Sequence, residues 1–295
     1  MNINFSLLRS IRVALIGLVV TAACRNLQAE SDVHFRLIDG NLIVIALNSG
    51  SRATFDFLLD TGTDTTVIDP SIASKLSFVP EDRIEVVSLS GSHSASRGSI
   101  PTLAAGPSRV DNVQVLLQEL PGLRRLDSHI AGILGQSFLS HFNYLVDYRR
   151  QVVRFESENE VLDTIDGEHV AIESRDHRMV VASEVQSRAS ANLRLVLDSG
   201  ADSLVLLHTA SQTLNLPMQS PSLQLVQGGQ VEMKTGRVNV LTVGSEKLHQ
   251  ITAILPDVDP GVPMGDGLLP TILFRAVYIN NRDGFVVFNP RTRKN

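Results

Sequence analysis

The stretch FLLDTGTDTTVID, residues 57–69, joins an apolar run of strand type to an acidic residue and a turn. The residues before Asp60 have the character of a buried strand, whereas Thr61 and Gly62 favour a turn. Burying a carboxylate costs free energy unless the group is paired or hydrogen-bonded. Asp60 therefore needs either a local partner or a chemical role, and one carboxylate does not decide between the two.

A second copy of this stretch, LRLVLDSGADSLVLL, occupies residues 193–207. It also runs from apolar residues into an aspartate, Asp198, followed by Ser199 and Gly200. The similarity extends to later segments in each half, AGILGQSFL at 131–139 and DGLLPTILF at 266–274. Such an internal repeat indicates a tandem duplication of one unit of about 130 residues.

Short strand-like segments dominate the chain and are separated by Gly, Ser, Asn and Pro. In the first half they lie at 42–47, 55–60, 83–89, 113–120, 144–148 and 151–155. Two short helices are expected there, over 71–78 and 135–142. The sequence thus predicts a mostly β protein, with an N-terminal lobe over residues 30–160 and a C-terminal lobe over residues 161–295.

The D-T-G and D-S-G triplets at 60–62 and 198–200 resemble the two half-sites of an aspartic peptidase. The residues after each triplet are similar to those of retropepsin-like enzymes, whereas two tandem lobes on one chain are similar to the pepsin-like arrangement. The resemblance covers about residues 34–290 and favours a bacterial-type member of this group. It implies a bilobal fold of two homologous β-barrel-like lobes with a few short helices.

The resemblance also implies an aspartic endopeptidase whose catalytic residues are Asp60 and Asp198. Two neighbouring carboxyl groups share one proton, as is known for aspartic proteases, because both cannot ionise cheaply. One carboxylate would take a proton from a water held between them, that water would attack the scissile carbonyl, and the other carboxyl would protonate the departing group. This chemistry requires no metal and no cofactor.

Four neighbours of the aspartates are expected to support the catalytic loops. Thr61 and Ser199 carry hydroxyls that can bond between the loops, and Gly62 and Gly200 allow tight backbone geometry around the carboxylates.

A hairpin over the site is expected to hold the substrate. Segment 84–103 has two extended runs around Ser90, Gly91 and Ser92 and takes the position of the family's flap. Its tip would add backbone hydrogen bonds to a peptide in extended conformation. Segment 223–238 has the equivalent position in the second half. An ordinary solvent-facing hairpin is the alternative, and segment 84–103 lacks the tyrosine of a pepsin-like flap.

One position departs from the repeat, because Pro270 stands where the first half has Gly135. Proline removes a backbone donor next to the second loop. The alternative to an endopeptidase is therefore a catalytically inactive, exported peptide-binding or scaffold protein with the same duplicated fold. The two intact triplets favour the enzyme, and Pro270 favours the alternative.

Composition restricts the partners. The formal net charge is −5 and basic residues are scattered, so nucleic acid is not an expected partner. The eight histidines have no metal-binding spacing. Because one chain carries both aspartates, a monomer is expected.

Residues 1–29 have the pattern of an export signal. Two arginines precede an apolar run at 13–23, which is shorter than the roughly 20 residues that span a bilayer. Either a signal peptide is removed after Ala29, or a lipoprotein signal ends before Cys24, the only cysteine, which is then lipidated. Both routes predict an exported protein that is periplasmic, anchored to a membrane or secreted.

Overall fold

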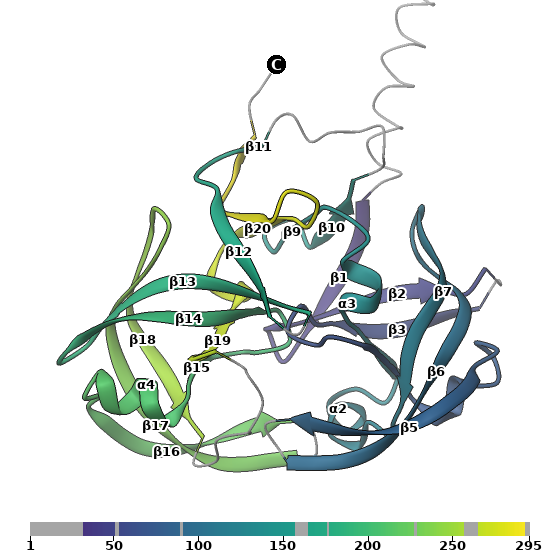
Figure 1. The fold of residues 1–295 in the computed structure, drawn as a ribbon, viewed down its shortest axis with the longest axis horizontal. Coiled ribbons are helices and arrows are strands. Elements are labelled where there is room, and N and C mark those ends of the chain that lie inside the picture. The colour runs from purple at the N-terminus through teal and green to yellow at the C-terminus, as the bar shows by residue number, and fades with distance from the viewer. Residues whose placement is uncertain are drawn as a thin grey trace, which may run out of the picture.

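A computed structural model describes residues 32–50, 53–88, 91–156, 165–175, 177–226, 229–256 and 265–292. The chain is mostly β and forms two lobes, the first blue and the second green in Figure 1. The expected export signal, with Cys24, and the expected lobe boundary at residue 160 lie outside the described residues. In the described ranges, no helix has the length and apolar character needed to cross a membrane.

The first lobe is a closed barrel of six strands in the order β2-β3-β8-β4-β7-β6, with β6 returning to β2. A seventh strand, β5, extends β6 into a long hairpin. The bounds are β2 (Leu42–Asn48), β3 (Thr54–Leu59), β4 (Thr66–Ile68), β5 (Val79–Ser88), β6 (Gly91–Ala105), β7 (Ser108–Leu117) and β8 (Ile130–Leu134). Strands β4 and β8 are buried along their whole length, as expected of strands covered on both faces.

The second lobe repeats these pairings as β13-β14-β19-β15-β18-β17, with β17 returning to β13. Strand β16 pairs with β17 and forms a long hairpin with it. Parallel and antiparallel pairs occur at equivalent places in both barrels. The predicted duplication into two β-barrel-like lobes is therefore confirmed. The bounds are β13 (Arg178–Gln186), β14 (Ser190–Asp198), β15 (Leu204–Leu206), β16 (Met218–Val226), β17 (Gly229–Val243), β18 (Glu246–Leu255) and β19 (Gly267–Pro270).

A shared antiparallel sheet joins the lobes, in the order β1-β10-β9-β20-β21-β12. Its central pair, β9 and β20, aligns Val146 with Val277 across the junction. The bounds are β1 (Asp32–Ile38), β9 (Tyr144–Asp147), β10 (Val152–Phe155), β12 (Val170–Arg175), β20 (Ala276–Asn280) and β21 (Phe285–Phe288). A two-stranded sheet of β11 (Ile165–Asp166) and β22 (Arg291–Thr292) lies apart from it.

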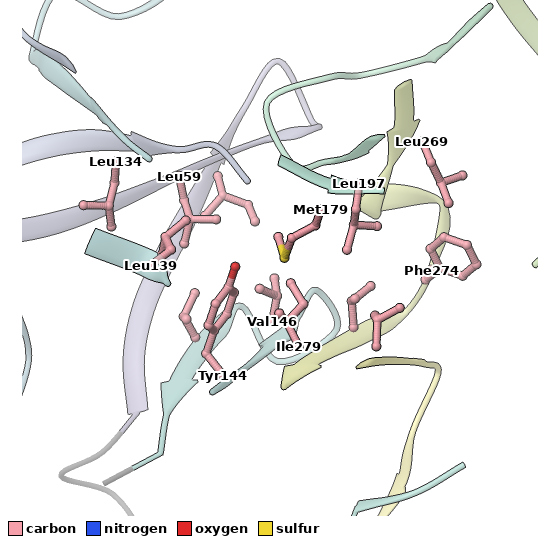
Figure 2. Close-up of a cluster of buried hydrophobic side chains, with 14 of the residues drawn as sticks. Leu59, Leu134, Leu139, Tyr144, Val146, Met179, Leu197, Leu269, Phe274 and Ile279 are labelled. Carbon is pink, nitrogen blue, oxygen red and sulfur yellow. The ribbon is translucent and has the colours of Figure 1, made fainter. Parts of the chain in front are cut away.

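The hydrophobic core is continuous between the lobes. Figure 2 shows Leu59 and Leu134 of the first lobe facing Leu197 and Leu269 of the second, with Met179 between them. These side chains are at most 5% exposed. The strand ends that carry the D-T-G and D-S-G triplets are thus fixed on one buried support.

The helices are shorter than the sequence predicts. The helix expected over 71–78 is wrong: a single 3₁₀ turn, η1 (Pro70–Ile72), is capped by Asp69, and the chain continues in turns to Ser77 at φ 54°. The backbone hydrogen bonds within residues 69–78 join residues three, four or five positions apart. A regular α-helix has only bonds between residues four positions apart. The helix expected over 135–142 is confined to α3 (Gln136–Leu139).

Three further helical segments are α2 (Pro121–Leu126), α4 (His208–Thr213) and η2 (Thr271–Leu273). Helix α2 was not expected, although Pro121 at its first position is a usual start signal. Hairpins β5–β6 and β16–β17 extend on the side opposite the shared sheet (Figure 1). Strand β17 of the second lobe contacts α2 of the first.

Candidate active site

The two aspartates lie where equivalent strands end at the junction of the lobes. Asp60 follows β3, and its N–H donates to the carbonyl of Leu134 at 3.0 Å. Asp198 ends β14, in register with Pro270 of β19. Only 9% of Asp60 and 8% of Asp198 is exposed. The parallel pairs β3–β8 and β14–β19 therefore place both carboxyls in nearly buried positions.

Thr61 and Ser199 tie the two loops together through four hydrogen bonds. The Thr61 hydroxyl donates to the carbonyl of Leu197 at 2.8 Å and accepts from the Ser199 N–H at 3.0 Å. The Ser199 hydroxyl donates to the carbonyl of Leu59 at 2.8 Å and accepts from the Thr61 N–H at 3.0 Å. Because both hydroxyls are buried, this reciprocal bonding fixes the distance between the triplets.

Each carboxylate accepts N–H groups from its own loop, but the two sets differ. Asp60 Oδ1 accepts the N–H groups of Gly62 at 2.8 Å and Thr63 at 3.1 Å, and its Oδ2 accepts the Thr63 hydroxyl at 2.7 Å. Asp198 Oδ1 accepts the N–H of Gly200 at 2.7 Å. Ala201 stands at the position equivalent to Thr63 and has no hydroxyl to donate.

The two glycines bring each carboxyl against the opposite loop. A Cβ atom on Gly62 would lie 2.7 Å from Cγ of Asp198, and a Cβ atom on Gly200 would lie 2.6 Å from Cγ of Asp60. Real Cβ atoms do not approach other atoms this closely. Glycine is therefore required at both positions by the carboxyl of the other lobe.

Burial raises the pKa of Asp198 well above its ordinary value, and the negative charge of Asp60 raises it further. The N–H of Gly200 partly offsets these effects by bonding the ionised form. A buried carboxyl beside a second carboxylate is the arrangement in which one proton is shared.

A second layer of contacts fixes the first loop, and sequence reasoning missed most of it. The Gln136 side chain donates to the carbonyl of Thr61 at 2.8 Å. Thr66 accepts the N–H of Gly135 at 3.2 Å, and the Ser137 hydroxyl accepts the N–H of Thr66 at 2.9 Å. Ser137 is therefore engaged in holding the loop.

Pro270 fits the backbone conformation of the second loop. Its φ of −66° is the value that the proline ring prefers. The donor that Pro270 lacks corresponds to the N–H of Gly135, which bonds Thr66 in the first lobe. The residue equivalent to Thr66 is Leu204, which offers no acceptor. Donor and acceptor are thus both missing from the second lobe.

The expected flap is a hairpin in the structure, formed by β5 and β6. Ser90 lies outside the described residues, whereas the backbones of Gly91 and Ser92 begin β6 and pair with Ser88 and Val87. The side chains at this tip also lie outside the description. Its role as a flap remains a prediction.

Comparison with known proteins agrees with this geometry. The family model described as aspartyl protease matches the chain twice, at residues 44–138 and 184–271. Each match contains one triplet, and together they span more than half of the chain. No match was found among curated proteins. With one family match on each barrel and one aspartate at the end of each central strand, the chain belongs to the aspartyl protease family.

Proposed function

We propose that the chain is an exported aspartic endopeptidase that hydrolyses peptide bonds with a water held between Asp60 and Asp198. The observation that carries this proposal is the reciprocal bonding of Thr61 and Ser199, which holds two nearly buried carboxyls against each other. Such a fixed pair supplies an acid and a base at the same point.

The unequal surroundings of the two carboxyls support a different role for each of them. Asp60 accepts three hydrogen bonds, including one from the Thr63 hydroxyl, whereas the equivalent residue of the second loop, Ala201, has no hydroxyl. Burial and the adjacent charge of Asp60 raise the pKa of Asp198, which supports Asp198 as the proton donor. Asp60 would therefore take a proton from the water while the oxygen of that water attacks the scissile carbonyl. Asp198 would give its proton to the carbonyl oxygen, forming a neutral tetrahedral diol.

Collapse of the diol completes the reaction. The proton held by Asp60 passes to the departing nitrogen, and a diol hydroxyl returns a proton to Asp198 as the C–N bond breaks. Both carboxyls then regain their starting protonation states, so no metal or cofactor takes part. A water molecule and a peptide are consumed, and a carboxylic acid and an amine are formed.

The remaining features of the proposal concern the substrate and the setting. Hairpins β5–β6 and β16–β17 lie on one side of the molecule, where they would add backbone hydrogen bonds to an extended peptide or protein segment. One chain supplies both triplets, so we propose a monomer. The export pattern of residues 1–29 supports a periplasmic, lipid-anchored or secreted protein.

Incubation of the protein with a diverse peptide mixture from pH 3 to 8, with and without a statine-type inhibitor, tests the activity. Asp60→Asn and Asp198→Asn should each abolish inhibitor-sensitive cleavage, and the double variant should be no worse than either, since the two groups act as a unit. Asp69→Asn is the matched control, because Asp69 is also buried but caps η1. It should lose stability while keeping its activity per folded molecule.

Folding of each variant is checked by thermal melting. Substantial cleavage by folded Asp198→Asn would refute the proposed pair. Binding of peptides without any cleavage by the wild type would favour the inactive peptide-binding alternative.

A further inference from the structure

Arg178 reaches from one lobe into the catalytic loop of the other. It is the first residue of β13 in the second lobe, and its Nε donates to the carbonyl of Gly62 in the first lobe at 3.3 Å. The N–H of the same glycine bonds the Asp60 carboxylate at 2.8 Å. By covalent geometry, the guanidinium therefore lies within about 10 Å of that carboxylate. The mechanism proposed above assigns no role to this charge.

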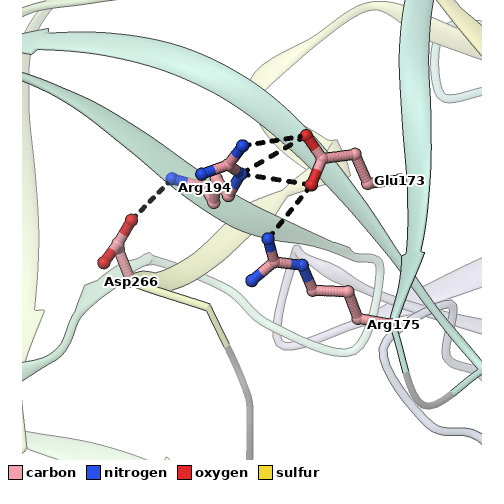
Figure 3. Close-up of polar contacts among 4 residues, drawn as sticks. All are labelled: Glu173, Arg175, Arg194 and Asp266. Atoms are coloured by element: carbon pink, nitrogen blue, oxygen red, sulfur yellow. Dashed lines mark hydrogen bonds and ion pairs between the residues drawn. The ribbon is translucent and has the colours of Figure 1, made fainter.

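The hairpin that carries Arg178 is held in place on both sides. Met179, the next residue, is buried in the core between the lobes (Figure 2). Figure 3 shows Arg194 of β14 bonded to Glu173 of β12 at 3.1 Å, while Arg175, which pairs with Arg178 across the hairpin, also contacts Glu173. These exposed ion pairs contribute little stability individually.

The guanidinium of Arg178 lacks the acceptors that comparable arginines have. The described part of the chain contains three partly buried arginines. Arg154 bonds the carboxylate of Asp32, and Arg237 bonds two side-chain oxygens. Among the described residues, Arg178 makes one hydrogen bond, to a carbonyl, and no ion pair. Its two Nη atoms are therefore left without a partner in this part of the chain.

A carboxylate is the group that such a guanidinium binds best. The planar fork of an arginine matches the two oxygens of a carboxylate, and partial burial strengthens the contact relative to water. Each residue of an extended peptide advances about 3.3 Å. A substrate side chain that binds the Arg178 guanidinium, within about 10 Å of the Asp60 carboxylate, therefore belongs to a residue within about three positions of the scissile bond. We propose that Arg178 is a specificity-determining residue that binds an acidic side chain of the substrate within three residues of the cleaved bond. This inference rests on the proposed peptidase function.

Digestion of a peptide mixture derived from whole proteomes, at pH 6 where Asp and Glu are ionised, tests the inference. Mass spectrometry of the products should show Asp or Glu enriched at one position near the cut. In synthetic pairs that differ by Glu or Gln there, kcat/KM should be about 10- to 100-fold higher for Glu, as expected for a charge-assisted bond.

In Arg178→Gln the ratio of kcat/KM for the Glu peptide to that for the Gln peptide should fall to about 1, and Arg178→Glu should favour Lys at the same position. Arg237→Gln, the control, should keep the preference for Glu. If Arg178 only holds the Gly62 carbonyl, Arg178→Gln will slow both peptides equally, which would overturn the inference. Absence of acidic residues near the cuts of the wild type would do the same.

If the wild type cleaves no peptide, the proposed function fails separately. Binding of a fluorescent library of Glu and Gln peptide pairs then decides the role of Arg178. Tighter binding of Glu peptides that is lost in Arg178→Gln would support the inference, and equal binding of both would refute it.

Discussion

Adding one methyl group to either aspartate loop should disable the proposed catalytic site while leaving most of the fold intact. In Gly62→Ala the new Cβ would lie 2.7 Å from Cγ of Asp198, and in Gly200→Ala it would lie 2.6 Å from Cγ of Asp60. Favourable contacts between carbon atoms begin near 3.5 Å, so the loops must separate by about 1 Å. The reciprocal bonds of Thr61 and Ser199 oppose this movement.

The size of the effect follows from that displacement. Overpacking of a close contact costs about 1–3 kcal/mol of folding free energy. A misplacement of about 1 Å between reacting groups lowers the rate about 100-fold. We therefore expect kcat/KM to fall by about two orders of magnitude in each variant, whereas thermal melting shows a modest loss of stability.

Gly40→Ala is the matched control for this experiment. Gly40 has a φ of +76° in a surface turn, and a Cβ there would meet no atom within 4 Å. Alanine at this φ costs about 1 kcal/mol through backbone strain alone. The control should lose stability but keep its kcat/KM. Folded Gly62→Ala and Gly200→Ala proteins with wild-type kcat/KM would refute the close approach of the two loops.

Four other outcomes are expected. Asp198→Asn should raise the melting temperature, because the raised pKa of Asp198 means that its ionisation destabilises the folded state; melting at several pH values should show this gain growing as pH rises above about 4. Thr61→Val should cost about 2–4 kcal/mol by chemical denaturation, since it removes two buried bonds between the lobes, and Thr61→Ser should restore most of it. Activity per mole should stay constant on dilution below micromolar concentration; a fall with concentration would indicate a site formed between chains. Intact mass of the exported protein should lack residues 1–29, or begin at an acylated Cys24; a retained Met1 would contradict export by cleavage.

The fold was largely predictable because the repeat is visible in the apolar pattern. Strands that are buried on both faces, such as β4 and β8, consist mostly of apolar residues, and similar runs recur in the second half as β15 and β19. Helix α2 and the turns after η1 were not predictable in the same way. Their short segments have weak periodicity, and the contacts of the surrounding loops decide their geometry.

The sequence also predicted which residues meet at the site, but not how they are held. The triplets indicated Asp60 and Asp198 because an apolar strand ended in a carboxylate twice. The bond from Gln136 to Thr61 and the position of Arg178 near Gly62 depend on residues more than 70 positions apart. No local pattern marks such contacts, so they emerge only from the tertiary arrangement.

One difference between the two lobes involves both partners of a hydrogen bond. Where the first lobe bonds Gly135 to Thr66, the second has Pro270 and Leu204, so a donor and its acceptor are both missing. Loss of the donor alone would leave a buried acceptor unsatisfied, which costs about 1–3 kcal/mol. The proline is thus compatible with a functional second loop and is weak evidence for an inactive protein. Thr63, in contrast, bonds Asp60 through its hydroxyl, whereas the equivalent residue of the second lobe is Ala201, which has none. The two carboxyls therefore have unequal surroundings. An acid and a base that act together require such a difference.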